Sequence, residues 1–252
     1  MKGCYMELGL MTWPDVEKYL AEKSAIMIPI GSTEQHGPMG LIGTDAITAE
    51  VIAKKAAEQC QVILGPCIAV GMALHHTEFP GTISLRPSTL IAYLSDYVIS
   101  LARNGFSKFY FVNGHGGNIP TCQAAFSEIY ERAAADPRIK QDLSCKLHSW
   151  FIAPEVSELA KELYGDHEGY HATPSEVSVT WHAYPEAVKD VDYPIPEPIE
   201  HPQIGSSLDF KKQFPTGVMG ANSRLASPED GKRFIDLASQ EVAKSFTKFL
   251  SA

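Results

Sequence analysis

The chain has 252 residues, of which 44% are hydrophobic, and it carries a formal net charge of -9. That length and composition suffice for one large core or two small ones. The acidity is spread along the chain, with no run of like charge longer than three residues. Nucleic acid is therefore not an expected partner, because phosphate binding needs clustered lysine and arginine.

Cysteine usage and apolar runs indicate the compartment. The five cysteines are odd in number and form no Cys-x-x-Cys pair; they are Cys4, Cys60, Cys67, Cys122 and Cys145. Neither a disulfide framework nor a zinc ribbon is therefore expected, and the expected location is a reducing compartment. The N-terminus lacks an apolar core of signal-peptide length, and no apolar run approaches the length of a membrane span. The sequence predicts a soluble, cytoplasmic protein with no membrane partner.

The first half of the chain alternates helices and strands. Helices are predicted over residues 13–20, 44–59 and 87–103. Strands are predicted over residues 25–30, 61–65 and 82–85. Thr12 is the expected cap of the first helix, and Thr44 or Asp45 that of the second, because their oxygens can accept from free N–H groups. Asn104-Gly105 marks the end of the helix over 87–103.

The second half continues the alternation. Strands are predicted over 109–112 and 143–151, and helices over 121–134, over 154–163, from about 176 and over 227–250. This order predicts an α/β fold with a mostly parallel sheet covered on both faces. The segment 183–226 has much proline and few periodic signals, so it is predicted to be a long ordered excursion and a candidate subunit contact. Without repeats or linker composition, residues 1–252 are predicted to form one domain.

Two loops that follow predicted strands concentrate polar side chains. In the stretch GSTEQHGP, Glu34 and His36 stand two positions apart, hence on one face of an extended chain, and Asp45 follows at the start of the next helix. The second loop, NGHGGN, carries His115. Ligands of open α/β sheets gather beyond the carboxyl ends of the strands. If the two strands are adjacent, two carboxylates and two imidazoles converge there.

Each of these side chains also has a purely structural interpretation. Glu34 can be a solvated loop residue, His36 a turn histidine and Asp45 a helix cap. That interpretation is weakest for His115, because its neighbouring glycines are costly unless the backbone adopts positive φ or approaches another group closely. Imidazole together with carboxylate suits zinc, manganese or iron(II), and a carboxylate able to bridge permits two metals.

A third polar cluster lies within residues 165–176. Its ionisable members are His167, Glu168, His171 and Glu176. His171 is a candidate acid–base group, and Glu176 is predicted near a helix start. His75 and His76 are further candidates for lining a pocket.

Together, these blocks resemble the creatininase family of metal-dependent amidohydrolases. The resemblance rests on GSTEQHGPMGLIGTDAITAE, HHTEFPGTISL, FVNGHGGN and HATPSEVS, which occur in the order and spacing of the family. It implies a three-layer α/β/α fold and a dinuclear metal centre. It also implies hydrolysis of a C–N bond in a cyclic amide or formamide-like small molecule, and a homo-oligomer, commonly a hexamer.

The resemblance implies a role for each matched residue. Glu34, His36, Asp45 and His115 would bind two divalent ions (Zn, Mn or Fe), with Asp45 as the bridging ligand. His171 would lie at the substrate and handle protons. Glu176 would complete the metal shell or orient a bound water.

The chain departs from the family pattern at two places. Creatinine-hydrolysing members carry a further metal-binding glutamate two residues after the histidine that matches His115, and this chain has Gly117 there. The block that usually reads His-Ala-Gly ends here in Thr173, followed by Pro174. Creatinine is therefore not the expected substrate. Other members with NGHGGN include deformylases of pyrimidine intermediates and peptidases that trim a modified peptide, and the sequence does not choose among them.

The expected chemistry is attack of a metal-activated hydroxide on a carbonyl carbon, with His171, or less readily Glu176, delivering a proton to the leaving nitrogen. Backbone N–H groups of the glycine-rich loop would help to stabilise the oxyanion. A metal-dependent phosphoesterase would use the same ligands but would need lysine or arginine for the phosphate, and the site loops contain none. A non-catalytic metal-binding protein of this fold is the third hypothesis.

Overall fold

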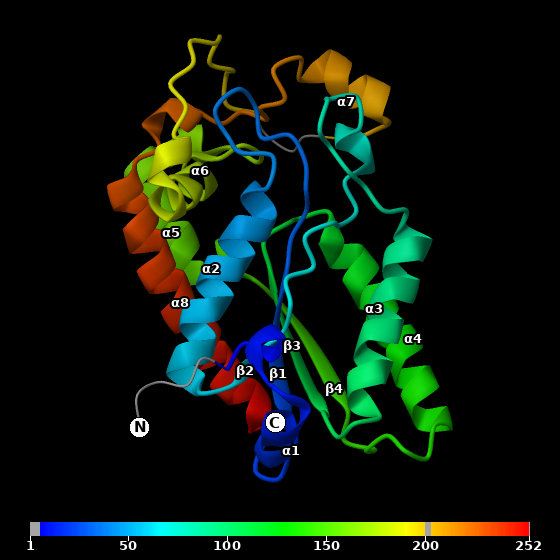
Figure 1. Ribbon diagram of the computed structural model, residues 1–252. Coiled ribbons are helices and arrows are strands. Elements are labelled where there is room, and N and C mark those ends of the chain that lie inside the picture. The colour runs from blue at the N-terminus through cyan, green and yellow to red at the C-terminus, as the bar shows by residue number, and fades with distance from the viewer. Residues whose placement is uncertain (1–5, 200–202, 252) are drawn as a thin grey trace.

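The computed structural model describes residues 6–199 and 203–251. At its centre lies a parallel sheet of four strands in the order β2-β1-β3-β4. The strands are β1 (Ala25–Ile30), β2 (Ile63–Leu64), β3 (Lys108–Asn113) and β4 (Ser144–Ser149). Helices cover both faces of the sheet (Figure 1), so the three-layer α/β/α arrangement is confirmed.

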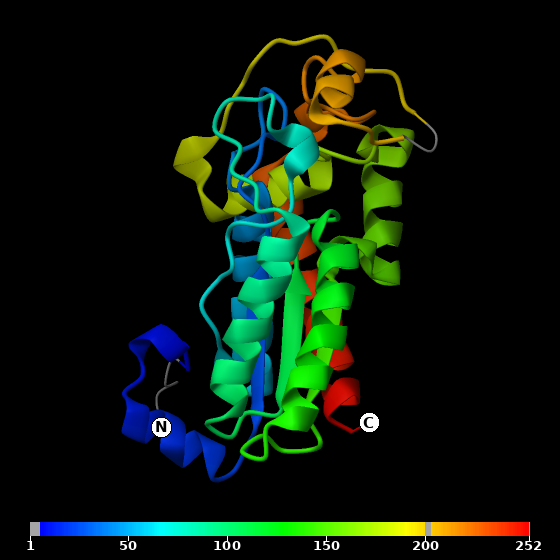
Figure 2. The ribbon, with the colours of Figure 1, turned by 90° about the vertical axis from the view of Figure 1, so that its right-hand side faces the viewer.

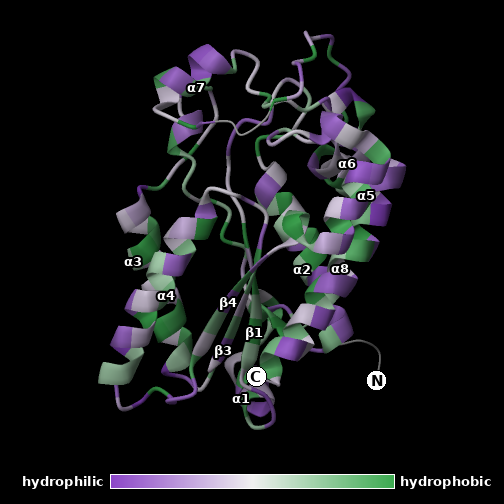
Figure 3. Ribbon diagram, turned by 180° about the vertical axis from the view of Figure 1, so that it is seen from behind, coloured by the Kyte–Doolittle hydropathy of each residue, from purple (hydrophilic) through white to green (hydrophobic). Residues whose placement is uncertain are grey.

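The helices of the described chain are α1 (Trp13–Leu20), α2 (Thr44–Cys60), α3 (Pro87–Ala102), α4 (Asn118–Ala135), α5 (Pro154–Tyr164), α6 (Pro174–Ala183), α7 (Ser207–Gln213) and α8 (Pro228–Leu250). Seen from behind, α3 and α4 lie on one side of the sheet, whereas α2, α5 and α8 lie on the other (Figure 3). All of the predicted helices are present, within a few residues of their expected ends.

Each face of the sheet builds its own core, because successive strand residues point to opposite faces. Met27 and Tyr110 pack against side chains of α2 and α8. Ile28 and Phe111 pack against side chains of α3 and α4. All six residues of β1 are buried, which explains why this strand is a continuous apolar run rather than an alternating one.

Several predicted boundaries are wrong. The strand expected over 61–65 is only the two residues of β2, and residues 82–85 form no strand. Instead, Ile83 N–H donates to the Thr33 carbonyl over 2.8 Å, so this segment pairs with a loop. The N-cap of α2 is Gly43, which leaves both Thr44 and Asp45 inside the helix. Helix α4 begins at Asn118 rather than 121, and residues 150–152 leave β4 as a 3-10 turn.

The segment 183–226 crosses the end of the molecule beyond the carboxyl ends of the strands. Figure 2 shows its first part as a yellow arch, and α7 is the one α-helix that its described residues contain. The segment then returns to the centre, where Met219 forms a β-bridge with His171. Its described residues, 183–199 and 203–226, therefore cover this end of the sheet. Its role as a subunit contact stays a prediction.

The described residues include four of the five cysteines. Cys60, Cys67, Cys122 and Cys145 are free thiols, and Cys4 lies outside the described residues. Within residues 6–199 and 203–251, every helix is too short or too polar to cross a membrane.

Candidate metal centre

The two polar loops emerge side by side because β1 and β3 are neighbours. Ile30 and Asn113, the last residues of these strands, are paired in register. The N-terminus of α2 packs directly against both loops. At Gly31 and Gly114 an added Cβ would overlap the backbone of Asp45, so glycine at these positions allows the close approach. The predicted convergence of the two loops is confirmed.

Asp45 lies at the centre of the resulting cluster. It is the second residue of α2 and is 2% exposed. Its Oδ1 lies 3.0 Å from His36 Nε2, and its Oδ2 lies 3.0 Å from His115 Nδ1. One carboxylate thus spans two imidazoles from two different loops, an arrangement in which its two oxygens would be available to two cations.

The two other carboxylates each accompany a different histidine. Glu34 Oε2 lies 3.3 Å from His115 Nε2, and Glu176 Oε2 lies 3.9 Å from His36 Nε2. Two groups of potential ligands therefore share Asp45: Glu34, Asp45 and His115 form one, and His36, Asp45 and Glu176 form the other, with the ligand atoms of each within 4.8 Å of one another. His115 thus faces Glu34 through Nε2 and Asp45 through Nδ1.

Glu176 has a structural role as well as a place in the cluster. Its Oε1 accepts from Thr173 N–H over 2.6 Å and completes the capping box at the start of α6. Its other oxygen faces His36. The predicted helix start is confirmed, and the cap fixes the side chain so that Oε2 stays directed at the site.

His171 joins the cluster from the opposite end of the chain. Its Nε2 lies 2.7 Å from the carbonyl oxygen of Gln35 and must be the protonated nitrogen, because a carbonyl only accepts. Its Nδ1 lies 3.8 Å from Glu34 Oε1. Burial and the nearby His36 lower the pKa of His171 well below its usual value. The ring is therefore neutral, and its unprotonated Nδ1 faces the cluster.

The electrostatics of the cluster fit a cation. Burial, together with the neighbouring charge of Asp45, raises the pKa of Glu34 to about 8, although His115 and His36 oppose this shift. Burial lowers the pKa of both histidines, but nearby carboxylates outweigh this effect. The charge of Asp45 raises the pKa of His36 to about 10. The charges of Glu34 and Asp45 raise the pKa of His115 to about 9. Protons thus occupy the positions between these groups.

Orphaned oxygens provide the test of whether a metal fits. Both oxygens of Glu34 and Oδ2 of Asp45 are buried without a hydrogen bond of good geometry among the described residues. Unpaired buried carboxylate oxygens are costly, and they are rare unless an ion or ligand satisfies them. Imidazoles and carboxylates at these separations fit divalent transition metals.

The polar cluster at residues 165–176 divides between the site and the surface. Glu168 lines the cavity described below and accepts from the Ser175 hydroxyl. Burial raises the pKa of Glu168 to about 7. His167 is exposed, and its contact is a backbone one, from Asn222 N–H.

His76 and Gln35 contact the cluster, and neither is predicted as a ligand from the sequence. His76 was expected only to line a pocket, yet it is 1% exposed and its Nε2 lies 3.3 Å from Glu34 Oε1. Gln35, to which no role was assigned, contacts both His76 and His171. Only their positions in the sequence point to the site: Gln35 lies between Glu34 and His36, and His76 belongs to a histidine pair that precedes a tight turn. His75 stacks above His115 at 6.4 Å between ring centroids.

Gly117 leaves no space for a further ligand. A Cβ there would overlap His115 Nε2 and lie 2.6 Å from the Met72 carbonyl oxygen. Because His115 Nε2 also hydrogen-bonds to that carbonyl over 3.0 Å, a side chain at this position would displace the histidine. The departure from the family pattern is therefore built into the packing around His115.

A cavity of about 670 Å³ opens onto the cluster. Asp45, His115, His171 and Glu176 line its floor, and its walls include Phe151, Ile152 and Ile199 together with the charged side chains of Lys161, Asp166 and Glu168. Such a volume admits a small organic molecule or the end of a peptide.

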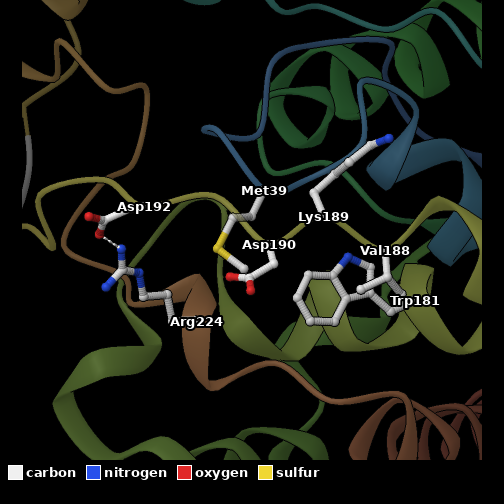
Figure 4. A pocket seen from close by; sticks show the side chains of 7 residues that line it. All are labelled: Met39, Trp181, Val188, Lys189, Asp190, Asp192 and Arg224. Carbon is white, nitrogen blue, oxygen red and sulfur yellow. Dashed lines mark hydrogen bonds and ion pairs between the residues drawn. The ribbon is translucent and has the colours of Figure 1, made fainter.

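A second cavity, of about 460 Å³, lies beside α6 (Figure 4). Met39, Trp181 and Val188 form its apolar wall, and the ion pair of Asp192 with Arg224 lies at one side. None of the side chains that converge on Asp45 line this cavity, so it is not part of the candidate metal centre.

Comparison with known proteins agrees with this geometry. A family model described as creatininase, creatinine amidohydrolase, matches residues 9–246. The chain belongs to the creatininase family. The same arrangement of layers occurs in a solved structure named as a manganese creatininase, with a TM-score of 0.85 at 23% identity over 97% of this chain and 98% of that one. Another, named as a creatininase mutant of Zn–Zn type, gives a TM-score of 0.80 at 23% identity over 97% and 98%.

Relatives within the family carry different names. A mycofactocin precursor peptide peptidase of Mycolicibacterium smegmatis is 38% identical over 106 residues, which is 40% of this chain and 42% of the relative. A 3-dehydro-scyllo-inosose hydrolase of Thermotoga maritima is 29% identical over 71% of this chain and 55% of the relative. The chain thus spans about half the length of these relatives. A creatinine amidohydrolase of Pseudomonas putida is 25% identical over 94% of both chains.

Proposed function

We propose that this protein is a metal-dependent hydrolase that cleaves the C–N bond of an amide in a small molecule. The observation that carries the proposal is Asp45, whose two oxygens each face a different histidine at 3.0 Å inside a buried cluster. Membership of the creatininase family supports hydrolysis, since the named relatives include an amidohydrolase, a hydrolase and a peptidase.

Two divalent cations are proposed for the cluster, with Zn, Mn and Fe as the candidates. Glu34, His115 and Asp45 would hold one, and His36, Glu176 and Asp45 the other. Ions bound there would polarise the substrate carbonyl and lower the pKa of water, which is the chemistry that hydrolysis at neutral pH requires. The orphaned oxygens of Glu34 and Asp45 support this assignment.

The remaining polar groups are proposed to manage protons. At Nδ1, the nitrogen that faces the cluster, His171 can accept the proton that the attacking water loses. Its Nε2–H meanwhile stays bound to the Gln35 carbonyl. The imidazolium that forms can then release the proton to the leaving nitrogen. Glu176 is less suited to this role, because one of its oxygens is held by the Thr173 N–H.

The cavity supports an amide rather than a phosphate ester. Its lining holds one lysine, Lys161, and no arginine among the described residues, but it includes the carboxylates of Asp166 and Glu168. A phosphate group would be repelled by these carboxylates and would lack a bidentate partner. Cyclic amides, formamides and the ends of short peptides all suit the mixed apolar and acidic walls.

A substrate screen tests the proposal. Protein loaded with zinc or manganese is assayed against cyclic amides, N-formyl amines, short peptides and p-nitrophenyl phosphate, with Asp45→Asn as the control. Turnover of an amide that the Asp45→Asn variant lacks supports the proposal. Turnover of the phosphate ester alone would establish the phosphoesterase, and metal binding without any turnover would favour a non-catalytic homologue.

The organisation of the protein is proposed on the same basis. Residues 1–252 would act as a single catalytic domain in the cytoplasm, assembled as a homo-oligomer, with a hexamer expected from the resemblance. Light scattering measures the state directly, and a monomer at micromolar concentration would contradict it.

A further inference from the structure

Gln35 lies behind the metal ligands, and its amide makes contacts that fix the hydrogen positions around it. Its Oε1 lies 2.8 Å from the backbone N of Gly37, which can only donate. Its Nε2 lies 3.0 Å from the carbonyl oxygen of Gly217, which can only accept. Two independent partners therefore agree on which end of the amide is oxygen and which is nitrogen.

The two hydrogens of this amide have three neighbours. Besides the Gly217 carbonyl, Nε2 of Gln35 lies 2.9 Å from His76 Nδ1 and 3.0 Å from His171 Nε2. His171 Nε2 already donates to the backbone carbonyl of Gln35 over 2.7 Å, so it has no lone pair to offer. The second amide hydrogen must go to His76, and Nδ1 of that ring must be unprotonated.

The consequence reaches Glu34. A histidine ring with an unprotonated Nδ1 carries its hydrogen on Nε2. That atom of His76 lies 3.3 Å from Glu34 Oε1, while Oε2 of the same carboxylate lies 3.3 Å from His115 Nε2. His76 and Glu34 are both buried, at 1% and 0% exposure, so water does not compete for the contact.

We propose that Gln35 and His76 are positioning residues for the metal centre. Gln35 holds His76 in the Nε2–H tautomer. That nitrogen lies 3.3 Å from Glu34 Oε1 without forming a hydrogen bond of good geometry in this structure, and with a cation bound it would donate to that oxygen and orient the carboxylate. The inference rests on the proposed metal-dependent function. Groups that orient a ligand from behind in this way usually contribute roughly 10–100-fold to metal affinity.

The geometry at residue 217 fits this arrangement. Gly217 has φ of +85°, and a Cβ there would overlap the amide of Gln35. Glycine at this position, which lies in the long excursion, therefore leaves the space that the Gln35 amide occupies. The excursion thus supports the site from behind as well as covering it.

Neutron diffraction from crystals of protein whose metal has been removed with a chelator tests the tautomer of His76. The result depends neither on activity nor on bound metal. Deuterium is expected on Nε2 of His76 and on Nε2 of His171, and not on Nδ1 of His76. Deuterium on Nδ1 of His76, alone or together with Nε2, would overturn the proposal.

Zinc affinity, measured by chelator competition, tests the role. His76→Leu is expected to weaken zinc binding roughly 10–100-fold. His76→Gln places an amide N–H near the Nε2 position and should restore affinity to within about threefold of wild type, which a merely structural role would not predict. His148→Leu, at a partly buried histidine on β4, is the control with unchanged affinity. Equal losses in both His76 variants, or no loss in His76→Leu, would refute the role.

A double-mutant cycle tests whether Gln35 acts through His76. Gln35→Met with His76→Leu should bind zinc no more weakly than His76→Leu alone. Fully additive losses of zinc affinity would contradict the proposal that Gln35 acts through His76. If the wild-type protein binds no zinc, manganese or iron, the proposed function fails, while the neutron experiment still decides the tautomer.

Discussion

Replacement of Asp45 by asparagine is expected to abolish both metal positions at once. The side chain keeps its size, but its negative charge is lost and one of its two oxygens becomes an NH₂ group. In the wild-type protein those oxygens lie 3.0 Å from His36 Nε2 and from His115 Nδ1. Asparagine can accept from one of these rings only, and it presents a donor to the other.

The magnitude follows from burial. Asp45 is 2% exposed, so the loss of its charge is not compensated by water. Removing one partner of a buried ion pair costs about 3–5 kcal/mol. That energy corresponds to a loss of roughly two to four orders of magnitude in affinity, summed over the two cations that the ligand would share. The variant should therefore be metal-free at micromolar zinc.

Chelator competition and elemental analysis measure the effect, and circular dichroism confirms that the variant is folded. Asp142→Asn is the matched control, because Asp142 is 58% exposed and pairs only loosely with Lys108 at 3.8 Å. It should bind zinc as the wild type does. Folded Asp45→Asn protein that retains two ions and full turnover would refute the bridging role.

Three further outcomes are expected. His171→Ala should lower kcat by about 10²–10⁴-fold with metal content unchanged, because the ring moves protons, and loss of an ion would instead make it a ligand. Gly117→Ala should destabilise the protein by about 1–3 kcal/mol in denaturant unfolding and weaken zinc binding, because its Cβ meets His115; wild-type stability would contradict the packing argument. His148 gives a pH dependence. Burial lowers its pKa to about 4 from 6.5, so between these values the unfolded chain binds a proton that the folded protein does not, and stability falls as pH falls from about 6.5 to 4. At pH 5 this histidine should lower the free energy of unfolding of the wild type by about 2 kcal/mol, and His148→Leu should not show that loss. Identical dependences of stability on pH in the two proteins would exclude this role of His148.

The sequence predicted the layers and the convergence of the loops because both depend on local patterns. The apolar run of β1 and the helical spacing in α2 are visible without tertiary information. Whether the strands of the two loops are neighbours stayed a condition at the level of sequence; the structure pairs β1 with β3, and this brings Glu34 and His115 together. The short β2 and the missing strand at 82–85 were mispredicted, because strand pairing depends on which neighbours the fold offers.

The orientations within the site could not be predicted from the chain. Asp45 was an equal candidate for a helix cap, and only the position of Gly43 as N-cap leaves both its oxygens for the histidines. The contribution of Gln35 depends on Gly217, 182 residues away in the chain. Contacts over such separations leave no periodic signal, so the cover formed by the long excursion was anticipated only in outline.

The central claim is that Asp45 bridges two cations, and anomalous diffraction at the zinc edge tests it most directly. Crystals of protein purified without chelators and grown with zinc should show two anomalous peaks per chain, one beside Glu34 and His115 and one beside His36 and Glu176, with Asp45 bound to both. A single peak, or peaks away from Asp45, would contradict the account.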